Sequence, residues 1–546
     1  MAKTMSPLQT VRQASKKAAR SKASTPAEQP SVRRTGNGSD DDLVAAPAAM
    51  SPNLMAAPES GVKIRMYRQG HGDCFLLAFR QADGTPFYML IDCGMKKGSQ
   101  IDRRVSMGDI AGHIRASTGG RLHLVVITHE HEDHVSGFLS EDEVFSSLTI
   151  DRLWLAWTEK ADDPLAKRLR KKYKDTLLGL AATAERLRAL NAAPSDRVRR
   201  ILDSLLGFEL SDQDLALAAR DPDKIAGITN KKAILVVKRR ADKRQGTEYL
   251  RPHEKTLELT NVPGVRVFVL GPPEDEAKLK DMDPRGAEEF PLALRAAEER
   301  AFLAAAGGET GETESQQPFA TTYRIPLGTA AAHEHAPFFK KYYGLVPQPR
   351  RDPRAWRRID ADWLRAGEQF ALRMNTFVNN TSLVLAIELP KTKKVLLFTG
   401  DAQRGNWASW NDGEWTSKNG PAKAETVQAS DLLQRTVFYK VGHHGSENAT
   451  LNAGGLREMA QDAFRDHFVA MVPANEQWAL NSNDPPWRHP YGPIYQALLQ
   501  KARGRVLVMD RDVEKPTTDV LSASEWRDFL NHTIYNVLFI EFTVQD

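Results

Sequence analysis

The sequence contains little cysteine and no long apolar run. Only two cysteines occur among its 546 residues, Cys74 and Cys93, which is too few for a disulfide framework, so we expect two buried thiols in a reducing compartment. No stretch approaches the roughly 18 apolar residues of a membrane span, and the N-terminus lacks the apolar core of a secretory signal. We therefore predict a soluble, cytoplasmic protein with no membrane partner.

Residues 1–60 contain almost no large apolar side chains. They are rich in alanine, serine, proline and basic residues, a composition that favours a disordered tail over a packed segment. We interpret this tail as a flexible extension rather than as a specific nucleic-acid-binding arm. The net charge of the whole chain is only +5, which by itself identifies no partner.

The rest of the chain is long and apolar enough for a substantial core. Hydrophobic residues make up 41% of the sequence, and 546 residues exceed one average domain, so either two domains or one domain with large insertions is expected. We predict one α/β domain over residues 61–546. Insertions are expected at about 156–262 and 274–375, the second of which would cap the functional site.

Short apolar runs predict a β-rich structure with helical crossovers. Asp83-Gly84 lies between two such runs and indicates a hairpin turn. A basic amphipathic helix is predicted within about 160–220, where leucines recur at helical spacing. The predicted strands are 62–67, 74–79, 88–92, 122–128, 150–155, 233–237, 265–270, 382–387, 395–399, 437–441, 468–473, 506–509 and 537–540.

The segment 129–134 is the strongest functional signal. Its six residues include three imidazoles and three carboxyl groups, directly after a predicted strand. This arrangement directs His129 and His131 to one side of a loop, while Asp133 and His134 begin the next helix. Imidazole nitrogen and carboxylate oxygen are ligands that zinc, manganese and iron accept. A solvated acidic turn would explain the acidic residues but not three histidines, so we predict a metal site.

Other polar residues also stand at the ends of predicted strands. They are Asp92, Asp401 and the adjacent pair His443 and His444. Strand ends on one edge of a layered sheet converge, and ligands collect there. We therefore expect these side chains to join the 129–134 cluster.

These motifs resemble the metallo-β-lactamase superfamily. His129-x-His131-x-Asp133-His134 matches its metal-binding signature, and Gly400-Asp401 matches its later bridging aspartate. Five motifs, in the right order, resemble the branch that contains the soluble hydrolase domain of bacterial DNA-uptake channels. They are Gly70-His71-Gly72-Asp73-Cys74, Ile91-Asp92-Cys93-Gly94, Asn380-Thr381-Ser382-Leu383-Val384, Phe398-Thr399-Gly400-Asp401 and Lys440-Val441-Gly442-His443-His444-Gly445-Ser446.

The resemblance covers about 62–155, 263–273 and 376–510. It implies a four-layer αββα sandwich with a metal site at one edge, and a cofactor of two divalent cations, zinc first and manganese or iron as alternatives. Asp401 would bridge the two cations. The metal ligands that it implies are His129 and His131 for the first cation, Asp133 and His134 for the second, Asp401, and one of His443 and His444.

One departure from the family pattern concerns the first metal. The family often supplies another histidine between the first cluster and the aspartate, where this chain reads Asn379-Asn380-Thr381-Ser382. We therefore expect a weaker first site, or a single tightly bound metal.

The predicted chemistry is hydrolysis by a metal-activated water. A metal lowers the pKa of its bound water to about 7 and polarises the oxygen under attack, so that no nucleophilic side chain is needed. Asp133 would orient the water as well as bind metal. His489 would contact substrate or donate a proton, with a purely structural role as the alternative. Asp92 would hold a ligand histidine through a hydrogen bond.

Three further residues are predicted to surround the ligands or contact the substrate. They are Asn380, Ser382 and Ser446, and none of these serines has an apparent base partner that would make it a nucleophile. His71 has no assignable role.

The leading hypothesis for function is a phosphodiesterase or nuclease that acts on single- or double-stranded nucleic acid. Basic clusters would neutralise phosphates, and two tyrosines offer faces on which unpaired bases stack. The alternatives are a hydrolase of a small ester, lactone or amide, and a non-catalytic metal-binding regulatory module. The basic segments are Lys167–Lys172, Lys238–Arg240, Lys340–Tyr343 and Arg350–Arg351.

Overall fold

A computed structural model describes the part of the chain that carries the predicted motifs. The described residues are 54–140, 147–171, 230–281, 283–288, 325, 334, 336–344, 377–411, 413–417, 425–482, 487–513 and 521–546. Most of the predicted tail, and most of the predicted insertions at 156–262 and 274–375, lie outside them. So do Arg350, Arg351 and most of the predicted helix at 160–220.

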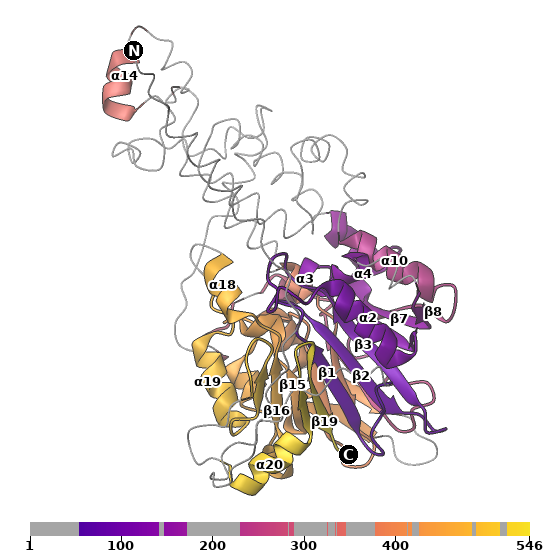
Figure 1. The fold of residues 1–546 in the computed structure, drawn as a ribbon. Helices are drawn as coiled ribbons and strands as arrows, with labels where there is room; N and C mark the ends of the chain where they lie inside the picture. The colour runs from indigo at the N-terminus through magenta and orange to yellow at the C-terminus, as the bar shows by residue number, and fades with distance from the viewer. Residues whose placement is uncertain are drawn as a thin grey trace, which may run out of the picture. The chain divides into compact units, whose positions relative to one another are not determined.

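Two large sheets form the body of the fold (Figure 1). Their strands alternate with helices, so the class is mixed α/β. The eight-stranded sheet has the order β18 (Thr533–Tyr535), β19 (Phe539–Val544), β1 (Val62–Tyr67), β2 (Cys74–Arg80), β3 (Pro86–Cys93), β5 (Leu124–Ile127), β7 (Arg152–Ala156) and β8 (Gly246–Leu250). The seven-stranded sheet has the order β17 (Val506–Val508), β16 (Val469–Val472), β15 (Thr436–Lys440), β12 (Val395–Phe398), β11 (Val384–Glu388), β10 (Arg266–Gly271) and β9 (Leu257–Glu258).

One hydrophobic core joins the facing sides of the two sheets. It contains Phe75 and Val126 from the first sheet together with Leu385 and Phe398 from the second. The rings of Phe75 and Phe398 meet edge to face with centroids 5.9 Å apart. Alternate strand residues point to opposite faces, so each sheet has a second apolar face to cover.

Helices cover these outer faces (Figure 1). In the first sheet the outer face packs on α2 (Met107–Thr118) and α10 (Lys231–Ala241). In the second it packs on α16 (Arg404–Trp410), α17 (Ala429–Gln434) and α19 (Gly492–Lys501). The other described helices are α3 (Glu132–Val135), α4 (Gly137–Ser140), α11 (Glu276–Leu279), α14 (Ala336–Tyr343), α18 (Glu476–Ser482) and α20 (Ala523–Asn531).

Strand direction decides where the loops meet. In the first sheet β3, β5, β7 and β8 are parallel, and in the second β12, β15, β16 and β17 are parallel. Parallel strands end at the same edge of a sheet. Because β2 runs antiparallel to β3, the beginning of β2 lies at the edge where β3 ends, with Cys74 opposite Cys93.

Most predicted strands are confirmed, and one is wrong. The Asp83-Gly84 turn joins the antiparallel pair β2 and β3. Residues 233–237, predicted as a strand, belong instead to α10. Ala233, Ile234 and Val237 of this helix are buried whereas Leu235 is 42% exposed, a helical spacing that the short apolar run concealed.

The predicted insertion at 156–262 is not wholly outside the sheets. Its strand β8 pairs in parallel with β7, and β9 pairs with β10. Two short ribbons lie apart from the main sheets, β4 (Arg121–Leu122) with β6 (Thr149–Ile150) and β13 (Glu414–Ser417) with β14 (Glu425–Gln428). Among the described residues, no helix combines the length and the apolar character that crossing a membrane requires.

A buried ion pair ties the C-terminal strand to the first one. Arg65 of β1 stands opposite Glu541 of β19, and its Nε and Nη2 donate to Glu541 Oε2 at 2.9 and 2.6 Å. Both side chains are under 10% exposed. Arg65 Nη1 also donates to Ser117 Oγ of α2 at 2.8 Å. Removing one partner of such a pair leaves the other charge buried and unpaired.

We expect Glu541→Ala to lower the free energy of unfolding by about 3–5 kcal/mol, because the Arg65 guanidinium would stay buried without its carboxylate partner. Urea denaturation followed by circular dichroism measures the loss. The control is Asp162→Ala, which removes an 81% exposed carboxylate 4.0 Å from Lys160 and should leave the midpoint nearly unchanged. Equal midpoints for Glu541→Ala and wild type would contradict the assigned role of the pair.

Candidate metal centre

The loop after β5 and the loop after β3 approach each other closely. Asp73 N donates to Asp133 O at 2.9 Å, and Gly94 N donates to Asp73 O at 3.0 Å. A Cβ at Gly94 would lie 2.5 Å from His134 N, so only glycine permits this contact. The backbone of the 129–134 loop is thereby held against the end of β3.

Several residues of the centre adopt strained backbone conformations. Asp92, His443 and His444 have φ values of 55°, 44° and 53°. The left-handed region is unfavourable for residues with a side chain and persists where surrounding contacts impose it. Gly400, at φ 52°, precedes Asp401, and a Cβ there would meet Thr128 and Ser382 at 3.0 Å. Backbone strain therefore occurs at the residues that direct these side chains into the centre.

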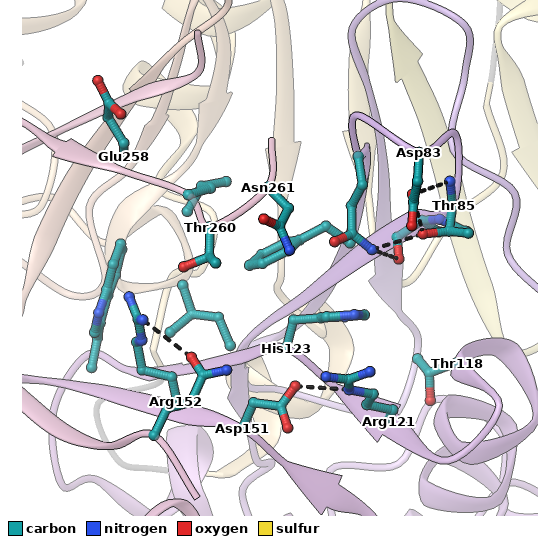
Figure 2. Close-up of a pocket in the computed structure, with 17 residues that line it drawn as sticks. Asp83, Thr85, Thr118, Arg121, His123, Asp151, Arg152, Glu258, Thr260 and Asn261 are labelled. Atoms are coloured by element: carbon teal, nitrogen blue, oxygen red, sulfur yellow. Dashed lines mark hydrogen bonds and ion pairs between the residues drawn. The ribbon is translucent and has the colours of Figure 1, made fainter. Parts of the chain in front are cut away.

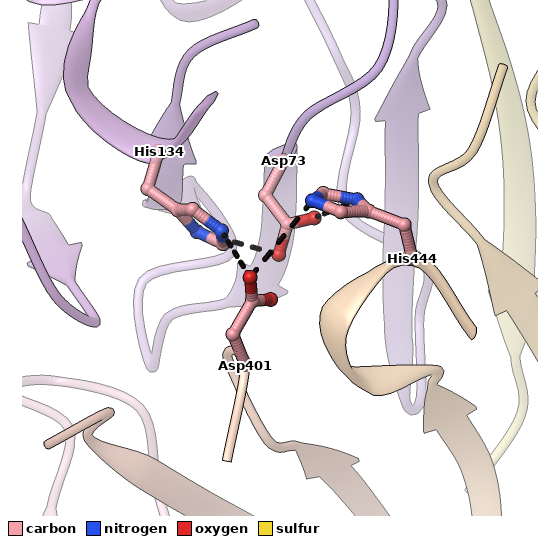
Figure 3. A group of neighbouring side chains, drawn as sticks. All are labelled: Asp73, His134, Asp401 and His444. Atoms are coloured by element: carbon pink, nitrogen blue, oxygen red, sulfur yellow. Dashed lines mark ion pairs between the residues drawn. The ribbon is translucent and has the colours of Figure 1, made fainter. Parts of the chain in front are cut away.

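Buried histidines and aspartates from four loops gather into two overlapping groups. One contains Asp73, His134, Asp401 and His444, and the other contains His129, His131 and Asp401. Within each group the candidate ligand atoms lie within 4.8 Å of one another, and all of these residues are buried. Figure 3 shows the four side chains of the first group pointing toward one another. The cluster is compatible with a divalent metal ion.

His134 presents a lone pair to a carboxylate. Its Nδ1 lies 2.8 Å from Asp92 Oδ2, and since an ionised carboxylate only accepts, Nδ1 carries the hydrogen. In the neutral ring Nε2 is then an acceptor, yet it lies 3.1 Å from Asp401 Oδ2, a second acceptor. Two acceptors at this distance repel each other unless a cation lies between or beside them.

His444 repeats this arrangement. Its Nδ1 lies 2.9 Å from the carbonyl oxygen of Pro473, so Nδ1 is the donor. Its Nε2 faces Asp133 Oδ2 at 2.9 Å and Asp401 Oδ2 at 3.8 Å. A backbone carbonyl or a carboxylate on the distal nitrogen of a metal-binding histidine is a common arrangement, because it fixes the ring and its tautomer.

The second group is also oriented toward Asp401. His129 Nε2 lies 2.9 Å from His131 Nδ1 and 3.9 Å from Asp401 Oδ2. The other nitrogen of His129 contacts Thr128 Oγ1 at 3.1 Å and Ser382 Oγ at 3.3 Å. Thr128 Oγ1 donates its hydrogen to Asp92 Oδ2, so it accepts from His129 and leaves Nε2 as a lone pair.

Four buried atoms of the cluster make no hydrogen bond among the described residues. They are His131 Nε2, His134 Nε2, Asp73 Oδ1 and Asp401 Oδ2. Buried polar atoms without partners are costly and rare in native proteins, and a bound ion is one explanation for them. Their concentration in one small cluster supports a fit to a metal.

Carboxyl groups outnumber the buried ammonium groups around the cluster. Lys440 pairs with Asp73, donates to Gly400 O at 2.9 Å and lies 3.6 Å from Asp401 Oδ1. Lys96 Nζ lies 3.0 Å from Asp133 Oδ1. In the described part of the chain, the four buried carboxyl groups of Asp73, Asp92, Asp133 and Asp401 share two buried lysines, Lys440 and Lys96. The surplus of carboxylate favours a cation.

The electrostatic environment shifts the histidines in opposite directions. Burial lowers the pKa of His129 well below its usual value and that of His131 to about 3, so both rings are neutral at pH 7. Burial would also lower the pKa of His134, but the Asp401, Asp73 and Asp92 carboxylates raise it well above the usual value. In the metal-free protein His134 therefore carries a proton.

The structure brings most of the predicted ligands together and adds two residues. Asp73 belongs to the first group, whereas predicted Asp133 lies beside it, between Lys96 and His444. Asp73 lies in the motif Gly70-His71-Gly72-Asp73-Cys74, but it precedes a strand rather than following one. The prediction from residues at strand ends therefore assigned it no role. Lys440 closes β15 and was likewise given no role.

The sequence left open whether His443 or His444 is the last metal ligand. His444 belongs to the first group, and His443 belongs to neither group. His443 Nδ1 lies 2.7 Å from Ser446 Oγ, and its Nε2 lies 3.2 Å from Asn379 Nδ2. Predicted Ser446 thus contacts His443 rather than the cluster.

Predicted Ser382 and Asn380 support the loop that carries Asp401. Ser382 Oγ accepts from Asp401 N at 3.0 Å. Asn380 Oδ1 accepts from Gln403 N at 3.0 Å, and Asn380 Nδ2 donates to Asp281 O at 2.9 Å. Asn380 therefore connects three segments and does not take the place of a ligand histidine.

His489 lies beside the cluster. Its Nδ1 is 3.3 Å from His71 Nε2, and its ring centroid is 6.3 Å from that of His444. Burial lowers its pKa well below the usual value. His489 is half-buried, whereas the histidines of the two ligand groups are buried.

A separate cavity of about 490 Å³ lies at the other end of the first sheet (Figure 2). Its walls include Phe87 near the start of β3, Leu124 at the start of β5 and Arg152 at the start of β7. The metal cluster follows the ends of β3 and β5. The charged Arg121 and Asp151 in the cavity pair with each other at 2.8 Å. The cavity is therefore distinct from the metal centre.

We expect metal uptake to release a proton, because the metal must displace the one on His134, whereas His129 and His131 are already neutral. Affinity should rise with pH across about pH 6 to 8, where the raised pKa of His134 keeps the metal-free ring protonated. Isothermal titration of chelator-treated protein with Zn²⁺ in buffers of different ionisation enthalpy counts the protons. A binding enthalpy independent of buffer would contradict this assignment.

We expect Asp92→Asn to weaken metal binding about 10- to 100-fold, because the charge that orients His134 is lost while the side-chain shape is kept. Competition with a chromogenic chelator gives the affinity. Asp466→Asn, at a side chain that is 67% exposed, is the matched control and should bind metal as wild type does. Identical affinities for both variants would remove Asp92 from the centre.

Comparison with known proteins adds no family assignment. No protein-family profile matches the sequence, and no curated protein matches it either. The case for a metal centre therefore rests on the contacts of the buried cluster, and the resemblance to the metallo-β-lactamase superfamily stays a prediction.

Proposed function

We propose that this protein is a metal-dependent hydrolase of phosphodiesters, with the αββα sandwich of the metallo-β-lactamase superfamily. The observation that carries the proposal is the convergence of imidazole nitrogens and carboxylate oxygens on Asp401. Two packed sheets with helices on their outer faces, and a cluster at one sheet edge, are what that architecture requires.

The two overlapping groups suit two adjacent cations, zinc in the first place, with Asp401 between them. His129 and His131 would hold one, and His134, His444 and Asp73 or Asp133 the other. Such cations, when bound, supply a Lewis acid that activates water and stabilises charge on a phosphoryl group. The absence of a third histidine in the first group agrees with a weaker first cation.

The protein's own residues orient this centre. Two hydrogen bonds of 3.0 Å orient Asp401: its backbone N donates to Ser382 Oγ, and His443 N donates to its Oδ1. Lys440 fixes Asp73. His489, which is half-buried, is placed to contact the substrate; its lowered pKa keeps the ring neutral, which argues against the alternative role as proton donor.

A basic surface at the same edge favours a polyanionic substrate. Residues 164–171 are helical and expose Lys167, Arg168 and Lys171. Their buried side packs Leu169 against Trp157, which follows the end of β7, and against Leu279. Cationic groups beside a metal centre attract phosphates and raise the rate of encounter. A small neutral ester or lactone would gain nothing from them.

We expect the zinc- or manganese-loaded protein to cleave single-stranded DNA or RNA, and His131→Ala to lower the rate by about a hundredfold or more through loss of metal. Cleavage of end-labelled strands and metal content per chain are measured on the same samples. His532→Ala, at the histidine that directly follows α20 and belongs to neither ligand group, is the matched control.

Different outcomes separate the remaining candidates. Turnover of small esters or lactones without cleavage of any nucleic acid would replace the phosphodiesterase proposal with the small-molecule hydrolase. Stoichiometric metal without turnover of either class would favour a regulatory module. Less than about one metal per chain, with His131→Ala identical to wild type, would overturn both catalytic proposals.

A further inference from the structure

A row of aromatic rings leads from the metal cluster to the half-buried border of the site. The His71 ring lies 4.2 Å from that of His444 and stacks on that of His489 at 5.3 Å and 14°. His489 in turn stacks on Trp487 at 5.5 Å and 20°. Trp478 lies 5.0 Å from His71 and 5.8 Å from Trp487. Two tryptophans therefore stand two ring contacts away from a candidate metal ligand.

Hydrogen bonds hold the row in a fixed orientation. Asn475 N donates to His71 Nδ1 at 3.2 Å, so the hydrogen of His71 is on Nε2, which donates to His489 Nδ1 at 3.3 Å. Asn475 Nδ2 donates to Ser99 O at 2.8 Å and anchors this segment to the loop after β3. His71 itself is fully buried.

The tryptophans are not explained by core packing. Trp478 and Trp487 are half-buried, and neither belongs to the core between the sheets or to the cores behind them. Arg488, between Trp487 and His489, is exposed. Flat aromatic faces next to a cationic side chain are what proteins use to stack the bases of unpaired nucleic acid while holding its phosphates.

We propose that Trp478 and Trp487, oriented by His71 and His489, bind a nucleobase of the substrate whose phosphate enters the metal centre. The substrate class is then a nucleotide phosphodiester with unpaired bases, since stacking of neighbouring base pairs in a duplex covers the base faces. This inference rests on the proposed function and narrows it from phosphodiesters in general.

Binding to chelator-treated, full-length protein tests the inference without turnover. Fluorescence anisotropy is measured with labelled oligodeoxythymidylate, its duplex with oligodeoxyadenylate, and an abasic strand of the same length. Wild type should bind the thymidylate strand about tenfold or more tightly than the abasic strand, and Trp487→Ala and Trp478→Ala should each remove most of that difference. Trp487→Phe should retain most of it.

The matched control is Leu480→Ala, which truncates a 46% exposed apolar side chain on the same helix as Trp478. It should bind like wild type. Equal affinity of wild type for abasic and thymidylate strands, or unchanged discrimination in both tryptophan variants, overturns the inference. Circular dichroism and zinc content that match wild type show that a variant is folded.

The two proposals fail separately. Base-dependent binding that is lost in the tryptophan variants, with no cleavage after metal loading, would overturn the catalytic function and keep the nucleobase site. Cleavage at the wild-type rate in both the Trp478 and the Trp487 variants would overturn the nucleobase site and keep the catalytic function.

Discussion

The buried cluster places hydrogen-bond acceptors opposite one another, and the rest of the centre depends on how their repulsion is relieved. The ring nitrogens of His134 and His444 that face the cluster are opposite carboxylate oxygens, because their other nitrogens must donate to Asp92 and to the Pro473 carbonyl. Buried acceptors this close to each other are destabilising unless positive charge enters. A proton on His134 is the minimum solution, and its raised pKa reflects that demand. A divalent cation satisfies more of the cluster, including Asp73 Oδ1 and His131 Nε2, which a proton on His134 leaves without partners.

The two sheets make this concentration of charge possible. Each ligand loop follows or precedes a strand whose side chains are buried in a shared apolar core, so the loops cannot move apart without opening that core. Within the centre, Asp92, His443 and His444 adopt left-handed backbone conformations that direct their side chains inward. Lys440 and Lys96 neutralise part of the carboxylate charge and leave the remainder for the imidazoles and a cation.

The sequence predicts the elements that carry strong local patterns, and it misses those that depend on pairing across the sheet. Strand ends identified the neighbourhood of Asp401 and His444 because parallel strands finish at a common edge. Asp73 escaped this reasoning because β2 is antiparallel, so that its first residue rather than its last lies at that edge. The choice between His443 and His444 depends on which ring Ser446 and Asn379 engage, which no local pattern encodes. The run 233–237 was misread as a strand since five apolar residues fit either period.

The residues around the centre discriminate between possible substrates better than the candidate ligands do. Metal ligands of this kind suit esters, lactones and phosphodiesters alike. Two unrelated segments at the same edge differ in what they offer: the helical residues 164–171, beyond β7, present ammonium and guanidinium groups, whereas the segment after β16 presents Trp478 and Trp487. A molecule that uses both must carry repeated negative charge and planar rings within one short chain. Unpaired nucleic acid combines these properties, while a lactone has neither and a lipid phosphodiester lacks the rings. The residues around the cluster, rather than the ligands themselves, therefore favour a nucleic-acid substrate among those that the cluster would allow.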